Sequence, residues 1–274
     1  MAIYCMSGTG NSYYVGKRIA EALNLKLRNG LNIHTKDGAI IMDNDDYVGF
    51  VFPIYDFKAS KAFLKQIQKI KVSQSAYVFA VATYGVGTLS TYKNFTSEME
   101  SCGKRIDGGF AVFMPHNAVG PGGLSDEDIY KILNLSEKDL ESVIKWVKNR
   151  EKGDHMSTKA FDLLKSKYAR KMIPAVISLM KALIFHGADS LKFQVDDNCV
   201  ECGLCSRICP AHNINRVDGA PKFGDNCINC FACIQWCDKM AISFGGKRLG
   251  LRKYTHPKVE AREMIEFNSN KETL

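Results

Sequence analysis

Eight of the ten cysteines in this 274-residue chain fall between Cys199 and Cys237, and their spacing is the strongest chemical signal in the sequence. They form two copies of the pattern C-x2-C-x2-C-x3-C, one beginning at Cys199 and the other at Cys227. A short loop with this spacing brings its first three thiolates to three irons of a cubane, while the fourth thiolate reaches a second cubane. The doubled pattern therefore predicts two [4Fe–4S] clusters.

Each predicted cluster takes three ligands from one copy and its fourth ligand from the other copy. The ligands predicted for cluster A are Cys199, Cys202, Cys205 and Cys237. The ligands predicted for cluster B are Cys209, Cys227, Cys230 and Cys233. Over about fifty residues this segment resembles a bacterial two-[4Fe–4S] ferredoxin.

The second copy departs from the ferredoxin pattern at its last position. Asp238 follows Cys237, whereas Pro210 follows Cys209 in the first copy. The aspartate restores a backbone N–H that proline lacks and adds a negative charge beside cluster A. Because charge and hydrogen bonding to sulfur set cluster potentials, we expect the charge to make cluster A harder to reduce, with the added N–H acting in the opposite direction.

Zinc and disulfides are the alternative uses of these cysteines. Paired C-x2-C motifs form tetrahedral zinc sites, but zinc has no use for third and fourth cysteines at a repeated spacing. Disulfides are disfavoured in the cytoplasm, the compartment that we expect because no basic-then-apolar signal region opens the chain. The apolar run 172–185 contains Pro174 and Lys181 and falls short of the about 18–20 residues that span a bilayer, so no membrane span is expected.

A second chemical signal is the loop SGTGNS at residues 7–12, between a short apolar strand and a helical pattern. Backbone N–H groups and a helix N-terminus suit a phosphate. A Walker A loop needs a different lysine spacing, and a dinucleotide fingerprint needs glycine where Tyr13 stands. The hydroxyls of Ser7, Thr9 and Ser12 suit a phosphate monoester, and the loop is similar to the phosphate loop of flavodoxins, which bind FMN. A plain tight turn is the alternative.

Three later segments, FPIYDF (52–57), ATYGVGTL (82–89) and MPHNAVGPGG (114–123), follow predicted strands. Because the carboxyl ends of parallel strands meet at one edge of a sheet, these loops are expected around the isoalloxazine ring. His116 and Tyr84 are the candidates for a catalytic proton donor, with surface exposure and packing as their ordinary alternatives. The predicted FMN-binding residues are Ser7, Gly8, Thr9, Gly10, Asn11, Ser12, Pro53, Ile54, Tyr55, Thr83, Tyr84, Gly85 and Asn117.

The elements that position these residues alternate along the first 150 residues. Continuous apolar runs rich in Val, Phe and Tyr predict strands buried on both faces, and stretches with helical periodicity lie between them. This alternation predicts an α/β fold with a doubly wound parallel sheet. The expected strands are 2–6, 47–55, 76–84 and 108–115, and the expected helices are 12–27, 59–70 and one that begins at Ser125.

The composition shifts along the chain predict four parts. They are a flavodoxin-like FMN-binding domain at 1–152, a basic amphipathic helical linker at 153–190, a small α+β two-[4Fe–4S] ferredoxin domain at 191–246, and a C-terminal tail at 247–274. Most of the net charge of +8 comes from residues 148–192. No nucleic-acid-binding pattern accompanies this stretch, so we expect a solvated helical face or a surface that steers an acidic redox partner, and no nucleic acid.

The order of these parts resembles the EFR1-type flavodoxin–ferredoxin fusion proteins of anaerobic bacteria and archaea. SGTGNS, FPIY, MPHN, the two cysteine copies and RKYTHP (252–257) carry the resemblance. It implies an electron-transfer flavoprotein that links low-potential one-electron donors, such as a ferredoxin or a reductase, to FMN through two [4Fe–4S] clusters. The alternative is an FMN-dependent reductase that delivers a hydride to a small-molecule acceptor, and a redox-gated interaction module is a third hypothesis. Whether the protein is an enzyme stays open.

Overall fold

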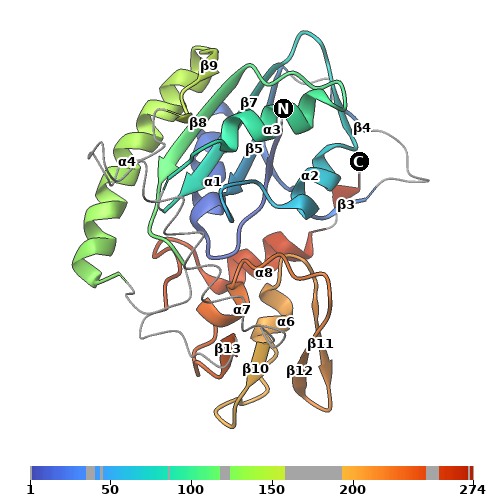
Figure 1. Cartoon of the computed structure of the whole chain (residues 1–274), viewed down its shortest axis with the longest axis vertical. Helices are drawn as coiled ribbons and strands as arrows, with labels where there is room; N and C mark the ends of the chain where they lie inside the picture. Colours follow the sequence, from blue (N-terminus) through green and yellow to red (C-terminus); the bar gives the residue numbers. More distant parts are fainter. Residues whose placement is uncertain are drawn as a thin grey trace.

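Figure 1 shows a computed structural model of the whole chain. The structure describes residues 2–34, 41–43, 46–85, 87–117, 124–157, 193–244, 253–270 and 272–273. A larger part built around a sheet lies above a smaller part built from the cysteine-rich segment (Figure 1). The predicted basic helices between residues 158 and 190 lie outside the described residues.

Six parallel strands form the main sheet, in the order β2-β1-β5-β7-β8-β9. The strands are β2 (Lys26–Asn29), β1 (Ala2–Cys5), β5 (Tyr47–Pro53), β7 (Tyr77–Tyr84), β8 (Gly108–Phe113) and β9 (Gly153–Asp154). Every residue of β7 and β8 is buried, which explains their uninterrupted apolar sequences. The first five strands have the order of a flavodoxin-like sheet, whose direction of winding reverses between β1 and β5.

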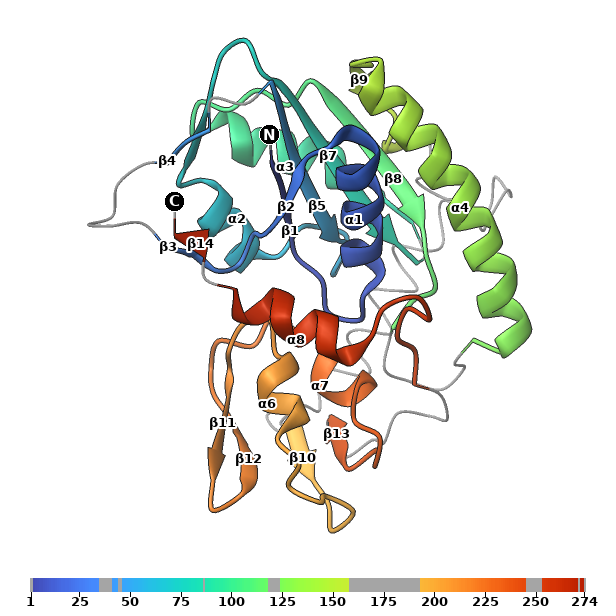
Figure 2. The same ribbon diagram turned by 180° about the vertical axis from the view of Figure 1, so that it is seen from behind.

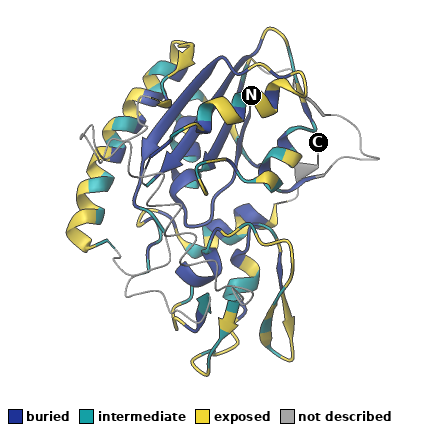
Figure 3. Cartoon of the chain, viewed as in Figure 1, coloured by how far each residue is buried: buried dark blue, intermediate teal, exposed yellow. Residues whose placement is uncertain are grey.

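Helices cover both faces of this sheet (Figures 1 and 2). Residues Val15 and Leu140, from α1 (Asn11–Leu23) and α4 (Asp126–Lys148), belong to one apolar core with strand residues such as Val51. Residues Phe63 and Phe95, from α2 (Lys61–Ile67) and α3 (Thr91–Glu100), belong to the core on the other face. The predicted doubly wound architecture is confirmed, and in Figure 3 the central strands form its buried centre.

Several boundaries differ from the prediction by a few residues, and two of the differences change the architecture. The helix expected over 12–27 ends at Leu23, Asn24 takes a left-handed conformation with φ 54°, and the next residues form β2. This strand was missed because it is a half-exposed edge strand whose sequence KLRN has no apolar run. The sheet also continues past residue 152, since β9 pairs with β8 and Met156 is fully buried.

The smaller part is an α+β unit, as predicted. Strand β10 (Phe193–Val195) pairs antiparallel with β13 (Ile242–Phe244), and β11 (Ile214–Val217) pairs with β12 (Ala220–Phe223). The short helices α6 (Leu204–Ile208) and α7 (Ala232–Gln235) each lie inside one cysteine copy. Two minor pairs, β4 (Ile41–Asp43) with β6 (Ile70–Val72) and β3 (Ile33–His34) with β14 (Glu272–Thr273), complete the described strands.

The C-terminal segment is more ordered than the tail that we expected. It contains the helix α8 (Ala261–Ser269), which a capping box between Glu260 and Glu263 stabilises at its N-terminus. Figure 2 shows α8 between the larger and smaller parts. The side chain of Asn268 donates to the carbonyl of Ile208 at 2.9 Å, and that of Asn29 donates to Phe267 at 3.0 Å. The helix therefore bonds to both parts. Its short apolar face was too brief to stand out as a periodic pattern.

Within the described residues, no helix combines the length and the apolar character that crossing a membrane requires.

Candidate functional site

A cavity of about 690 Å³ lies at the carboxyl edge of the main sheet. It opens where the winding of the sheet reverses between β1 and β5, the usual ligand position in such folds. The loops after β1, β5, β7 and β8 all contribute to its wall, so the structure brings the four predicted segments together. The predicted residues that line it are Ser7, Gly8, Thr9, Asn11, Ser12, Pro53, Ile54, Tyr55, Thr83, Tyr84, Gly85 and Asn117.

The N-terminus of α1 has the local structure of an anion-binding site. Gly10 precedes the helix with φ 94°, no described side chain caps the first turn, and this turn contains no acidic residue. Within the described residues, neither an N-cap side chain nor an acidic side chain of the first turn therefore offsets the positive end of the helix. The hydroxyl groups of Ser12 and Thr83 lie 2.8 Å apart and link the loop to the end of β7. These features fit a phosphate group.

Gly10 and Asn11 have roles that the sequence did not reveal. A side chain at Gly10 would meet Cβ of His256 at 3.1 Å and Cβ of Val259 at 3.2 Å, so this glycine faces the C-terminal segment and not the cavity. The amide of Asn11 donates to the carbonyl of Pro115 at 2.9 Å and accepts from the hydroxyl of Tyr254 at 2.7 Å. Its side chain therefore joins the start of α1 to the loop after β8 and to the C-terminal segment.

The two candidate catalytic residues lie together at the cavity. Tyr84 is buried, with its ring centroid 5.4 Å from that of Phe113. His116 lines the cavity, and a side chain at Gly85 would come within 2.4 Å of its Cβ, so the two loops are in close contact. Burial lowers the pKa of His116, which keeps its imidazole neutral at pH 7.

The four cysteines predicted for cluster A surround a second cavity of about 240 Å³ in the smaller part. The pKa of Cys205 is raised mainly by burial and further by the charges of Cys237, Cys199 and Cys202, which therefore lie around it. None of these four side chains is fully buried.

The four cysteines predicted for cluster B also come together. The pKa of Cys233 is raised mainly by burial and further by the charges of Cys230, Cys209 and Cys227. All ten cysteines carry free thiols in the structure. Within the described residues, no three His, Cys, Asp or Glu side chains converge as a single metal ion would require. A cubane does not require that convergence, because each thiolate binds a different iron.

The loop that carries the cluster B cysteines forms one wall of the larger cavity. Cys227, Ile228 and Phe231 line the cavity beside the residues of the sheet edge. A side chain at Gly8 would lie only 3.0 Å from Cβ of Cys230, so the two loops are in direct contact. This contact was missed, because nothing in a cysteine motif indicates which surface its loop will meet.

Three side chains strengthen the same contact. The indole N–H of Trp236 donates to the carbonyl of Gly8 at 2.9 Å. The side-chain amide of Asn117 donates to the carbonyl of Cys230 at 2.9 Å, and the backbone carbonyl of Asn117 accepts from the side chain of Gln235 at 3.1 Å. Asn117 thus lines the cavity, but its side chain reaches the cysteine loop. The signal available in the sequence was a tryptophan and a glutamine between two ligands, where the ferredoxin pattern requires neither.

Asp238 has an ion-pair partner. The ammonium group of Lys253 lies 3.0 Å from its carboxylate and donates to the carbonyl of Cys237 at 2.8 Å. The side chain of Asp238 is 90% exposed, whereas that of Lys253 is 27% exposed. The negative charge beside cluster A is therefore accompanied by a positive one from the C-terminal segment.

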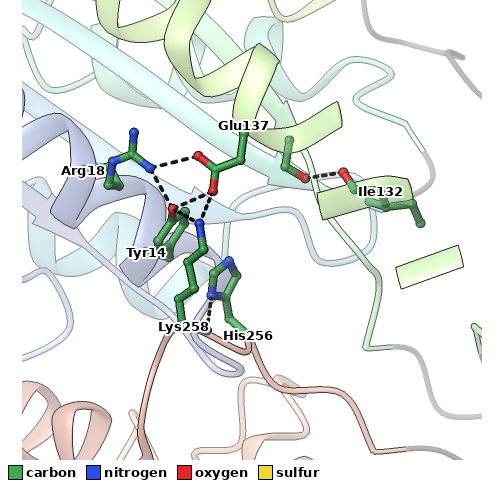
Figure 4. Close-up of polar contacts among 7 residues, drawn as sticks. Tyr14, Arg18, Ile132, Glu137, His256 and Lys258 are labelled. Atoms are coloured by element: carbon green, nitrogen blue, oxygen red, sulfur yellow. Dashed lines mark hydrogen bonds and ion pairs between the residues drawn. The ribbon is translucent and has the colours of Figure 1, made fainter. Parts of the chain in front are cut away.

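A polar cluster fixes the same segment to the larger part (Figure 4). Glu137 accepts from Tyr14 at 2.6 Å and from Arg18 and Lys258 at 2.8 Å each. Burial alone would raise the pKa of Glu137, but these hydrogen bonds outweigh it and lower the pKa to about 2. The His256 ring stacks on Tyr14 at 4.1 Å, and burial, with a smaller contribution from Lys258, lowers its pKa to about 4.

Comparisons with known proteins find a family match for the cysteine-rich segment. Residues 192–238 match a family model described as a 4Fe-4S dicluster domain. No curated protein matches the sequence at a significant level.

Solved structures similar to this chain each cover 53% of it. The Trp repressor binding protein from Bacillus subtilis is 12% identical, with 95% of its own chain covered and a TM-score of 0.33. An FMN-dependent NADH-azoreductase from Bacillus anthracis, in complex with FMN, is 10% identical, with 97% covered and a TM-score of 0.35. Rubredoxin oxygen:oxidoreductase from the anaerobe Desulfovibrio gigas is 11% identical, with 35% covered and a TM-score of 0.31.

The strand order of the larger part and the dicluster match of the smaller part define the class of this protein. It is a fusion of a flavodoxin-like α/β domain with a ferredoxin-type domain that carries two [4Fe–4S] clusters.

Proposed function

We propose that this protein is an electron-transfer flavoprotein that passes electrons between two [4Fe–4S] clusters and an FMN held in the cavity of about 690 Å³. One observation carries the proposal: the loop with the cluster B ligands Cys227 and Cys230 contacts the loop at the N-terminus of α1, and together they enclose this cavity. A cluster and a flavin on opposite sides of one wall exchange electrons without a diffusional step.

The residues around the cavity suit the two ends of FMN. The hydroxyls of Ser7, Thr9 and Ser12 and the first turn of α1 would hold the phosphate. The loops that contain Ile54, Tyr55 and Gly85 would surround the isoalloxazine ring. When bound, FMN supplies one-electron and two-electron chemistry at one ring system.

In this proposal, cluster A meets the redox partner and cluster B meets the flavin. None of the cysteines proposed for cluster A is buried, and they surround a cavity of their own, whereas three of those proposed for cluster B are buried and the exposed Cys227 lines the larger cavity. A protein donor of low-potential electrons, such as a ferredoxin, suits an exposed cluster. The cytoplasm, where thiols stay reduced, suits a chain with ten free cysteines. The resemblance to EFR1-type proteins is consistent with this role.

A reductase is the second candidate function, and the position of His116 favours it. His116 lines the cavity, as a residue that donates a proton to a bound substrate must. The variant His116→Asn separates the two functions. An electron carrier keeps its rate of flavin reduction by the clusters, whereas a reductase loses turnover of a small acceptor.

The proposal is tested by anaerobic purification and a redox titration that follows the flavin optically and the clusters by EPR. We expect one FMN and two [4Fe–4S] clusters per chain, with reducing equivalents moving from the clusters to the flavin. Protein that contains the clusters but binds no FMN when the cofactor is supplied anaerobically would overturn the proposal.

A further inference from the structure

A closed ring of hydrogen bonds joins the cluster B segment to two loops of the flavin cavity. Gln235, at the end of α7, donates to the carbonyl of Asn117 at 3.1 Å and accepts from the backbone N–H of Tyr254 at 2.7 Å. The hydroxyl of Tyr254 donates to Asn11 at 2.7 Å, and Asn11 donates to the carbonyl of Pro115 at 2.9 Å. The backbone closes the ring, because Pro115 and Asn117 are only two residues apart in the sequence.

The ring is buried. Gln235 is 2% exposed, Tyr254 is 6% exposed and Asn11 is 9% exposed. A buried polar group that loses its partner is costly, because no water replaces the lost hydrogen bond. The three side chains are therefore stable in one arrangement, in which α7, the start of α1, the loop after β8 and the C-terminal segment lie in contact.

Gln235 occupies a special position in the chain. It stands between Cys233, a predicted ligand of cluster B, and Cys237, a predicted ligand of cluster A. Its side chain, however, bonds to neither cluster loop, but to segments 118 and 19 residues away in sequence. A displacement of the ring therefore displaces the segment that carries one ligand of each cluster.

Further contacts hold the same parts together and agree with the ring. The backbone N–H of His256 donates to the carbonyl of Thr9 at 2.8 Å, in the loop that leads into α1. The indole N–H of Trp236 donates to the carbonyl of Gly8 in the same loop. Residues 253–259 thus lie against the cavity loops and the cluster segment at once, and α8 continues from them between the two domains.

We propose that Gln235 and Tyr254 are positioning residues that hold the cluster B segment against the flavin cavity, with residues 253–259 as the strap that joins the two domains. The inference rests on the proposed function for its consequence, since an electron that leaves cluster B must cross this junction to arrive at FMN. Its structural content, a junction fixed by the ring, is independent of that function.

The chain has a docked state, with the ring closed, and an open state in which the domains separate at the junction. Electron transfer requires the docked state, because transfer falls off steeply with distance. Each lost ring bond lowers the ratio of docked to open molecules by about tenfold, the factor that a buried hydrogen bond of ordinary net strength supplies. Neither Gln235 nor Tyr254 lines either cavity, so cofactor binding should survive in the variants.

The test uses two variants and two matched controls in the full-length, anaerobically loaded protein. Tyr254→Phe removes one hydroxyl, and Gln235→Met removes both bonds of the glutamine at nearly constant volume. Tyr130→Phe and Gln194→Met make the same chemical changes at exposed positions, the first of which is 67% exposed. Iron, sulfide and FMN contents are measured first. The rate of flavin reduction after rapid reduction of the clusters is then followed by stopped flow.

We expect full cofactor content in all four variants. The open-to-docked ratio should rise about tenfold in Tyr254→Phe and further in Gln235→Met, and the cluster-to-flavin rate should fall in both by the fraction of docked molecules that is lost, with wild-type values in the controls. Because both residues belong to one network, the double variant should be less than additive. Amide hydrogen exchange should rise at residues 232–236 and 253–256 in the ring variants only.

Wild-type exchange and wild-type rates in both ring variants would overturn the inference. If the wild-type protein holds both kinds of cofactor and its clusters do not reduce the flavin, the proposed function fails instead, and hydrogen exchange alone then decides whether the ring fixes the junction.

Discussion

The two cysteine copies have the same spacing, yet they build sites in different surroundings. Three of the four cysteines predicted for cluster B are buried, with Cys209 8% exposed and Cys230 and Cys233 7% exposed. The fourth, Cys227, is exposed and lines the cavity of about 690 Å³. None of the cluster A ligands is buried, and Cys202 is exposed. The spacing of the motif thus predicts which thiolates lie close together, whereas packing against the larger domain determines which set of cysteines is buried.

The largest difference between the sites should follow from removing one ligand from each. Cys230→Ala should lose cluster B, release FMN and abolish flavin reduction, because without its cluster the loop of Cys230, which contacts the Gly8 loop, is no longer held in place. Cys202→Ala should lose cluster A alone and retain FMN. Iron and flavin contents, measured anaerobically, check both outcomes.

Cys102→Ala is the control for these variants, since Cys102 lies beyond the end of α3 and belongs to neither cysteine copy. Equal FMN loss in Cys230→Ala and Cys202→Ala would remove the distinction between an enclosed and an outer cluster.

A fall in pH should destabilise the region around His256, next to the loop before α1, before it affects cluster A. Burial holds the pKa of His256 at about 4 in the folded protein, against about 6.5 when unfolded. Between these values the unfolded chain binds the extra proton, so stability falls as pH decreases. The loss between pH 6.5 and pH 5 is about 2 kcal/mol at most. Lys258 and Glu137 are the charged groups that face this histidine.

Thermal melting of the anaerobic protein at pH 7 and pH 5 measures this effect. His256→Phe keeps a ring on Tyr14 and should flatten the pH dependence, while His212→Asn, at an exposed residue with φ 48°, should leave it unchanged. An unaltered slope in His256→Phe would assign the acid sensitivity to other groups.

Crowding at the junction gives a smaller, local effect. Gly8→Ala would place a methyl carbon 3.0 Å from Cys230 Cβ and from the Tyr55 hydroxyl. Overpacking of this kind costs about 1–3 kcal/mol, so FMN affinity should fall by about ten- to a hundredfold, with cluster A unaffected. Fluorimetric FMN titration measures it. Adding Tyr55→Phe removes one crowded atom and should restore part of the affinity; no recovery would place the strain at Cys230 alone.

The smallest effect concerns cluster A. Lys253→Met removes the partner of Asp238 and should make cluster A harder to reduce, by up to about 40 mV for an ion pair worth ~1 kcal/mol at a surface. The double variant with Asp238→Asn should return most of the shift. EPR-monitored titration measures both potentials, and an equal shift at cluster B would show that the charge acts over the whole domain.

Local patterns were the predictable part of this structure. Strands such as β7 were recognisable because burial on both faces requires an unbroken apolar run. The cysteine spacing predicted a dicluster domain, and residues 192–238 match one, while the assignment of each cysteine to a cluster stays a prediction. The edge strand β2 and helix α8 were missed, because a half-exposed strand and a short helix leave weak patterns. The contacts of Gln235 and Tyr254 were beyond prediction, since each joins segments distant in sequence through single hydrogen bonds.

The narrow space at Gly8 has a consequence for how the protein is made. Cys230 lies against the loop that would hold the flavin phosphate, since a side chain at Gly8 would lie 3.0 Å from its Cβ. We therefore expect cluster insertion to precede flavin loading. Oxygen that destroys cluster B should therefore also release FMN, so that damage to one cofactor leads to the loss of the other.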